Sequence, residues 1–283
     1  SSAASDVYKR QHTTDGIEFM RGESLKKADI DHMMISYSTD IVTDYQFTEV
    51  PFDQLYKLTN IQGYHFVNHE LLDGYRDDAH CKPGFNLVVI DVDDGVDLAT
   101  VKLLLGEYQY LLYTTKRHTE DKPRFRMIFP LNYVVKLDGT DFKEFMRGIF
   151  DWLPFDVDRQ TSQRSRKWLT HAGHYEYNPG TTLDALLFIP KTSKSDKRKE
   201  IVNSQQALNG LERWFINNTE DGNRSNQLIR YALAQVDMGM DIDSIRNNVM
   251  ALNSKLTNKL DDAEILSTII VTASKHIHRR DTA

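Results

Sequence analysis

The sequence is poor in cysteine: Cys81 is the only one among 283 residues. A single thiol excludes an internal disulfide and any zinc site that needs several cysteines, and it is typical of a protein kept in a reducing compartment. Long apolar runs are also absent, since no segment reaches the roughly 18 residues that a membrane-spanning helix needs. The first residues lack the charged-then-apolar pattern of a secretion signal. We therefore expect a cytoplasmic protein with no membrane partner.

Charge of one sign is not in large excess either. The net charge of −6 disfavours a protein that binds polyanions over its whole surface. The distribution is uneven, because residues 110–200 contain 17 Lys and Arg against 12 Asp and Glu, a balance of +5, so the other residues carry −11. This pattern fits either a nucleotide or nucleic-acid site in the middle of the chain or ordinary charge fluctuation.

Hydrophobic periodicity divides the chain into two parts of different class. The first part mixes strand and helix patterns, whereas the last part shows only helical spacing. Between them, residues 191–199 are polar and basic with no apolar side chain, which predicts a linker. We therefore expect an α+β domain over residues 6–190, a linker over 191–205 and a small all-α bundle over 206–283, whose last helix begins with the capping-box-like pair Asp261 and Glu264. In the first domain the expected strands are residues 33–37, 64–67, 86–93, 108–115, 124–131 and 168–170, and the expected helices are 52–58, 98–105 and 141–153.

The clearest chemical pattern is a pair of acids at the end of an apolar strand. Asp91 and Asp93 are two residues apart, so both carboxylates project from one face while Val92 points away. Two like charges on a buried strand are costly, and a divalent cation with oxygen ligands, Mg²⁺ or Mn²⁺, removes that cost. Two such ions suit nucleotidyl transfer. The alternatives are a strand that simply ends at solvent in an acidic turn, and the nucleotide-sugar site of a DxD glycosyltransferase.

Two basic segments follow the acid pair. In residues 113–126 the expected strand places Arg124 and Arg126 on one face, beside a loop with Lys116 and His118. Such a set of cations suits a triphosphate, and its alternative is a solvated edge hairpin. In the second segment a third acid precedes a dense basic run that contains Arg166, as in many surface loops. A third carboxylate there would complete a two-ion site.

Taken in order, the three segments resemble the motif set of the archaeo-eukaryotic primase superfamily, especially the primase-polymerases of phages and plasmids. The resemblance covers roughly residues 73–173, and its specificity lies in the order and spacing of the motifs. It consists of the strand ending in Asp91 and Asp93, the loop 115–118 that leads to Pro-Arg-Phe-Arg at 123–126, and Asp158 followed by Arg166. The helical part, with residues 222–226 opening a helix, resembles the primase C-terminal domain of the same group.

The resemblance implies a fold and a set of residue roles. The fold is an RRM-like antiparallel sheet with a small α/β lobe. The implied ligands of two Mg²⁺ or Mn²⁺ ions are Asp91, Asp93 and Asp158, and the implied contacts of the incoming nucleotide are His118, Arg126, Arg166, Arg124, Thr115 and Lys116. The implied function is that of a template-dependent DNA primase and polymerase that makes or extends primers in phage or plasmid replication. Its partners are a single-stranded DNA template, an NTP or dNTP and a replicative helicase domain following residue 283, and its location is the host cytoplasm if a phage encodes it.

The sequence departs from the family pattern in three places. The motif serine is Thr115, or by the other spacing Lys116, and Gln163 stands where an acid is often found. Asp156 competes with Asp158 as the third ligand, and the spacing to Arg166 favours Asp158. A zinc-binding stem would have to use His65, His69, His80 and Cys81. Two other functions remain open: the DxD glycosyltransferase, and a non-catalytic single-stranded-DNA-binding module of an initiator or helicase loader.

Overall fold

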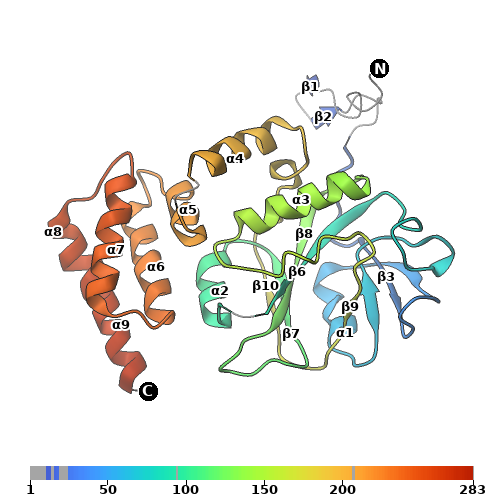
Figure 1. Ribbon diagram of the computed structural model, residues 1–283, viewed down its shortest axis with the longest axis horizontal. Coiled ribbons are helices and arrows are strands. Elements are labelled where there is room, and N and C mark those ends of the chain that lie inside the picture. Colours follow the sequence, from blue (N-terminus) through green and yellow to red (C-terminus); the bar gives the residue numbers. More distant parts are fainter. Residues whose placement is uncertain (1–10, 14–15, 19–24, 94, 206–207, 283) are drawn as a thin grey trace. The chain divides into compact units, whose positions relative to one another are not determined.

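The buried strand that the sequence predicts over residues 86–93 is present, and a sheet is built around it. The computed structural model describes residues 11–13, 16–18, 25–93, 95–205 and 208–282. Strands β6 (Phe85–Val92), β7 (Tyr110–Thr114), β8 (Phe125–Val135) and β10 (Tyr175–Asn178) form an antiparallel sheet in the order β10-β7-β8-β6 (Figure 1). Every residue of β6 is buried, which explains the apolar run over 87–90. The class is α+β, as predicted.

A second antiparallel sheet has the order β4-β3-β5-β9. Its strands are β3 (Met33–Ser38), β4 (Gln46–Val50), β5 (His65–Val67) and β9 (Trp168–Leu169). The short strand β9 lies beside β5 although about a hundred residues separate them, and it forms one edge of the sheet. A separate hairpin joins β1 (Gln11–Thr13) to β2 (Gly16–Glu18).

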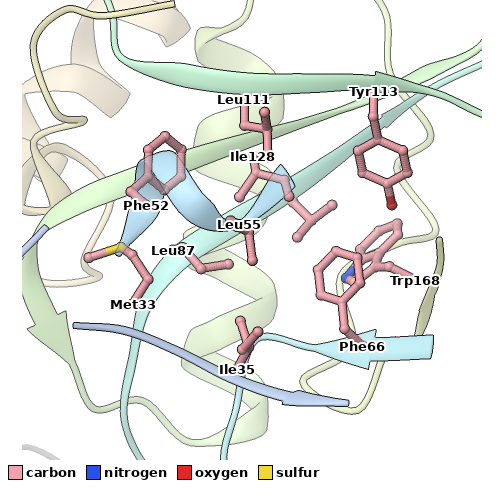
Figure 2. Packing of buried hydrophobic residues seen from close by; sticks show 11 residues of the cluster. Met33, Ile35, Phe52, Leu55, Phe66, Leu87, Leu111, Tyr113, Ile128 and Trp168 are labelled. Atoms are coloured by element: carbon pink, nitrogen blue, oxygen red, sulfur yellow. The ribbon is translucent and has the colours of Figure 1, made fainter. Parts of the chain in front are cut away.

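The apolar faces of the two sheets meet in one core cluster. Met33, Ile35 and Phe66 come from the second sheet, and Leu87 and Tyr113 come from the first (Figure 2). The short helices η1 (Phe52–Gln54) and α1 (Tyr56–Thr59) add to the same cluster through Phe52 and Leu55. Because β9 contributes Trp168 to this cluster, packing between the sheets fixes the position of a segment that is distant in sequence.

Helix α3 (Gly139–Trp152) carries the apolar stripe that the sequence predicts over 141–153. Its residues Phe142 and Phe145 make edge-to-face contacts with Phe85, at ring-centroid distances of 5.1 and 5.4 Å. The 3-10 turns η2 (Leu72–Gly74) and η3 (Ala185–Leu187) complete the irregular segments.

The segment predicted as a linker over 191–205 contains a helix, α4 (Ser193–Ser204), which the polar and basic composition did not indicate. Lys, Arg and Glu are good helix formers even without an apolar stripe. Thr192 Oγ1 accepts a hydrogen bond from Ser195 N, as an N-cap does. Arg198 then donates to the carbonyl oxygens of Leu187 and Gly148, at 3.0 and 3.3 Å. Because Leu187 and Gly148 lie well before the helix in the sequence, neighbouring residues alone do not predict these contacts.

The described residues group into two compact units that interleave along the chain. The first unit comprises the residues up to 93 with 107–150 and 157–201, and the second comprises 95–106, 151–156 and 202–282. Helix α2 (Leu98–Leu105) has the predicted bounds but belongs to the second unit, where Arg230 donates to its last carbonyls at Leu103 and Leu104 (2.8 and 3.1 Å).

The other helices of the second unit agree with the predicted all-α pattern. They are α5 (Gly210–Asn217), α6 (Arg224–Asp237), α7 (Ile242–Lys255), α8 (Asp262–Glu264), the π-helix η4 (Ile265–Ile270) and α9 (Val271–Thr282). The full capping box is at Asn209 and Glu212. At the predicted position Asp261 does cap α8, but Glu264 accepts a hydrogen bond from Ser225 instead. In the part of the chain described here, no helix combines the length and apolarity that crossing a membrane requires.

Candidate functional site

The acid pair lies where β6 ends, beside the start of β8. Asp91 faces Arg126 across the two strands, and Arg126 in turn faces Tyr113 on β7. The side chain of Asp91 is 9% exposed, whereas that of Asp93, just past the strand, is 53% exposed. One carboxylate is therefore buried and the other is open to solvent.

Each acid of the pair contacts one of the two predicted arginines. Arg126 Nε donates to Asp91 Oδ1 at 3.1 Å, and Arg124 Nη1 donates to Asp93 Oδ1 at 3.2 Å. The alternation of β8 thus brings both guanidinium groups to the face that carries the acids, as the sequence predicts. In the structure they neutralise carboxylates directly.

A set of aromatic rings and a carbonyl hold the guanidinium of Arg126. Its Nη1 donates to Leu169 O at 2.6 Å and to the Tyr113 hydroxyl at 3.4 Å. The group also lies over the Trp168 ring, 5.5 Å from its centroid. Tyr113 and Trp168 are at the same end of the inter-sheet core (Figure 2). Strand β9 therefore positions the arginine that contacts Asp91.

The third acid joins the pair through its backbone. Asp158 N donates to Asp91 O at 3.0 Å, so the two residues are neighbours although 67 positions separate their numbers. Asp158 Oδ1 accepts from Gln160 N at 2.9 Å within its own turn. The competing residue, Asp156, is exposed and belongs to the second unit.

The electrostatics of Asp91 show the effect of this crowding. Burial raises the pKa of Asp91, and the positive charge of Arg126 opposes that effect. The negative charges of Asp93 and Asp158 add to the rise, which places both acids within electrostatic reach of Asp91. A bound cation would favour the ionised form of all three.

Carboxylate oxygens are the type of ligand that a hard cation takes, but in this structure the three side chains are not gathered around one point. Each of the three carboxylates uses one oxygen in the bonds given above, and among the described residues the second oxygen accepts no hydrogen bond. Within the same part of the chain, no group of three or more His, Cys, Asp or Glu side chains stands close enough to hold a metal ion. A shared ion therefore requires Asp93 and Asp158 to turn toward Asp91. Both are less buried than Asp91, and each is engaged by one oxygen, Asp93 with Arg124 and Asp158 with Gln160 N.

The loop before β8 orients the predicted histidine. Arg124 N donates to His118 Nδ1 at 3.1 Å, and His118 N donates to Thr115 O at 3.0 Å. A backbone N–H only donates, so Nδ1 is the acceptor and a neutral ring carries its proton on Nε2. The ring is thus set to donate from Nε2. Thr115 is held against Arg124 by its backbone N–H (2.9 Å), and Lys116 is exposed in the turn.

Arg166 lies over the ring of Trp168. Its guanidinium is 5.5 Å from the centroid of that ring. Its buried Nε makes no hydrogen bond with any residue that the structure describes. Its charge lowers the pKa of Asp91, which places it within electrostatic reach of the acids.

The residues considered for zinc do not form a metal site in the described part of the chain. His69 is buried among aromatic rings, its Nδ1 contacts Asn68 Oδ1, and burial lowers its pKa to about 3. Cys81 Sγ donates to Asp77 O, and the His80 ring contacts the Asp77 carboxylate. A cavity of about 460 Å³ is lined by Tyr37, Tyr64, apolar side chains and the polar or charged Thr48, Glu49, Gln54 and Lys57, none of which belongs to the acid site.

Sequence reasoning missed Tyr113 and the carbonyl of Leu169 as partners of Arg126. Tyr113 could have been found, because a hairpin with the predicted loop 116–123 pairs Thr115 with Arg124 and hence Tyr113 with Arg126. The role of the Leu169 carbonyl could not have been predicted, because the position of Leu169 depends on the pairing of the two-residue strand β9 with β5.

Comparison with known proteins supplies the family. A search of curated proteins finds no match. Among solved structures, a crystal structure of primase RepB′ is similar at 12% identity, covering 89% of this chain and 94% of that chain, but its TM-score of 0.30 is too low to support an argument. The model of the VapE N-terminal domain matches residues 30–178, which is more than half of the chain and includes every residue of the predicted site. The chain therefore belongs to the VapE N-terminal domain family.

Proposed function

We propose that this chain is a template-dependent DNA primase and polymerase, a nucleotidyltransferase that makes or extends primers. The observation that carries the proposal is the backbone hydrogen bond from Asp158 to Asp91 at the end of β6, which Asp93 follows, beside the cations of β8. These are the acids and the basic residues that the primase-like motifs single out. Three carboxylates with electropositive neighbours suit the handling of a triphosphate and a divalent ion.

Each group has a role in this proposal. The three acids would hold two Mg²⁺ or Mn²⁺ ions, which would supply activation of a 3′-hydroxyl and charge neutralisation at pyrophosphate. His118 donates from Nε2 to a phosphate of the incoming NTP or dNTP, beside Thr115 and Lys116. Arg124 and Arg126 exchange a carboxylate partner for phosphate oxygens when the nucleotide binds. The template is single-stranded DNA, and a replicative helicase domain is the expected functional partner.

A second candidate function rests on the two arginine–aspartate contacts. Because Arg126 and Arg124 already neutralise Asp91 and Asp93, these pairs also suit a structural role in a module that binds single strands without chemistry. This candidate predicts strand binding without nucleotide incorporation.

Primer extension and de novo synthesis on a single-stranded template distinguish the two. Wild-type protein is incubated with NTPs or dNTPs and with Mg²⁺ or Mn²⁺, and product length is read on a gel. We expect template-dependent products from the wild type, a loss of at least about a thousandfold in rate for Asp91→Ala, and no loss for Asp121→Asn in the exposed loop.

Comparing Asp158→Asn with Asp156→Asn in the same assay tests the third ligand, and only the former should be inactive. Incorporation by Asp91→Ala at the wild-type rate would refute the proposal. Strand binding with no incorporation by the wild type would favour the binding module, and template-independent turnover of a nucleotide sugar would favour a glycosyltransferase.

A further inference from the structure

Four cations of the first unit stand out because none of them forms an ion pair within the described ranges. They are Arg76, Arg164, Arg166 and Lys167, and the residues that contact them supply carbonyl oxygens or an aromatic ring. In contrast, Arg124 and Arg126 each have a carboxylate partner. Unpaired cations that lie close together leave a positive potential that an anionic ligand would neutralise.

Arg76 is held rigidly at the centre of this group. Its Nε donates to Ile41 O at 2.6 Å and its Nη1 donates to Ser165 O at 2.9 Å. These bonds place the guanidinium of Arg76 beside residues 164–167, although nearly 90 positions separate Arg76 from that segment in the sequence. The bonded carbonyls are neutral, so the positive charge of Arg76 is not cancelled.

His65, at the start of β5, and Lys167, directly before β9, lie within electrostatic reach of Arg76. Burial lowers the pKa of Lys167, and the charges of Arg76 and Arg166 lower it further. Burial also lowers the pKa of His65, followed by the charges of Lys167 and Arg76. The charged forms of these side chains, here called the cation cluster (Arg76, Lys167, His65), disfavour one another; at neutral pH the lowered pKa leaves His65 neutral, and Arg76 and Lys167 carry the positive charge. The buried Nδ1 of His65 has no hydrogen-bond partner among the described residues.

The acids nearest to the cluster are already engaged. Asp40 acts on His65, but its Oδ1 accepts the backbone N–H groups of Val42 and Thr43. Asp78 accepts from Ser165 N and acts on Arg164. Neither carboxylate forms a salt bridge with the cluster, so the net positive charge remains.

One strand separates the cluster from the acid site. Leu169 O of β9 accepts from Arg126, which in turn contacts Asp91. Since β9 is an edge strand of its sheet, a long ligand that passes over it reaches both the cluster and the acids. Arg166, on Trp168, lies between the two.

Exposed apolar side chains surround the cluster. Ile41 is 50% exposed, and Tyr75 and Leu169 are each 41% exposed. Ile41 is bonded to Arg76 through its carbonyl, and Tyr75 precedes Arg76 in the chain. A mixture of cations with exposed aromatic and aliphatic groups is typical of surfaces that bind single-stranded nucleic acid, where phosphates meet the cations and bases stack on the rings.

We propose that the cation cluster binds the phosphodiester backbone of a single-stranded polynucleotide on its path to the acid site. The inference rests on the proposed function for the identity of the strand as template or primer, but the site itself requires no chemistry. Single-stranded binding of this kind depends on salt, with a slope of about 0.7 per phosphate contact.

The test measures binding of a fluorescein-labelled oligothymidylate by anisotropy, in EDTA and at several KCl concentrations. Lys167→Gln should weaken binding about fivefold at moderate salt and reduce the slope of log K against log salt by about 0.7. Lys167 forms no bond in the described structure, so this variant should keep the wild-type melting temperature. The exposed Lys26→Gln is the matched control and should bind as the wild type does.

Arg76 supplies an independent variant. Arg76→Gln should weaken binding by a similar factor, and Arg76→Lys, which keeps the charge, should retain most of the affinity. Inorganic triphosphate as a competitor separates a strand site from a nucleotide site: it should displace the oligonucleotide only at concentrations far above those of a competing oligonucleotide.

The outcomes separate the cluster from the proposed function. Suppose that the wild type incorporates nucleotides but Lys167→Gln leaves the oligonucleotide affinity and its salt dependence unchanged. The cation cluster is then not a strand-binding site, and the proposed polymerase function is unaffected. If Lys167→Gln weakens strand binding but the wild type incorporates no nucleotide, the cation cluster is supported as a strand-binding site and the proposed polymerase function is refuted. Weakened triphosphate binding with unchanged oligonucleotide binding would also overturn the strand site.

Discussion

At the scale of single residues, the site contains two arginine–aspartate pairs that differ in burial. Asp91 is buried and contacts Arg126, while the more exposed Asp93 contacts Arg124. Removing one partner of a buried pair leaves an uncompensated charge, whereas an exposed pair contributes little. The two arginines therefore have different effects on stability even though they share a face.

We expect Arg126→Gln to lower the free energy of unfolding by about 3 kcal/mol and Arg124→Gln by less than about 1 kcal/mol. Urea denaturation at neutral pH measures both. The double variant Arg126→Gln with Asp91→Asn should regain part of the loss, because no buried charge then remains unpaired. Equal losses for the two single variants would show that Asp91 is not held as a buried pair.

His69 gives the fold a pH dependence of known sign. Burial holds its pKa at about 3, below the value near 6.5 of an unfolded chain, so the unfolded state takes up a proton first as the pH falls. The contribution of His69 is fully present above pH 6.5 and is lost as the pH falls toward 3. Between those values the slope reaches about 1.4 kcal/mol per pH unit.

Urea denaturation between pH 7 and pH 4 checks this slope. His69→Phe, which keeps a ring between Phe85 and Phe142, should reduce it, and the exposed His32→Gln should leave it unchanged. If wild type and His69→Phe lose stability in parallel as the pH falls, the histidine is not buried in its neutral form.

At the scale of elements, strands were predicted well where periodicity decides the structure. The strand 86–93, the helix 98–105 and the paired face of Arg124 and Arg126 follow from patterns that a few neighbouring residues contain. Two features do not. The strand over 168–170 was predicted, but the position of β9 beside β5 depends on Trp168 packing into the inter-sheet core, and α4 is stabilised by Arg198 contacting segments far back in the chain.

If residues 193–204 form helix α4, a proline there should lower stability, which a proline in a flexible linker would not do. Lys197→Pro removes a backbone donor inside the helix and should cost about 3 kcal/mol in free energy of unfolding, whereas Lys197→Ala should cost little. Urea denaturation of the two variants provides the comparison. If Lys197→Pro is as stable as Lys197→Ala, the segment behaves as the linker that its composition predicts.

At the scale of the whole molecule, the two units are not consecutive in sequence. The chain leaves the first unit directly after the acid pair, forms α2 in the second unit, returns for β7, β8 and α3, and visits the second unit again at residues 151–156. Composition predicted an α+β part and a helical part. It did not predict the interleaving, because the placement of α2 in the helical unit depends on long-range hydrogen bonds from Arg230 of α6. The helix that follows the acids is therefore anchored in the helical unit.

The same long-range assembly produces the candidate site. Asp158 reaches Asp91 through a single backbone hydrogen bond, which spacing alone could not predict without a family resemblance. The site thus depends on how the segment after α3 is folded back along β6.

Binding of Mn²⁺, followed by electron paramagnetic resonance of the free ion, tests most directly whether the three carboxylates share divalent ions. We expect the wild type to bind Mn²⁺, and we expect Asp91→Asn and Asp158→Asn each to weaken binding at least about tenfold, while Asp121→Asn binds as the wild type does. Wild-type affinity in both Asp91→Asn and Asp158→Asn would contradict the account.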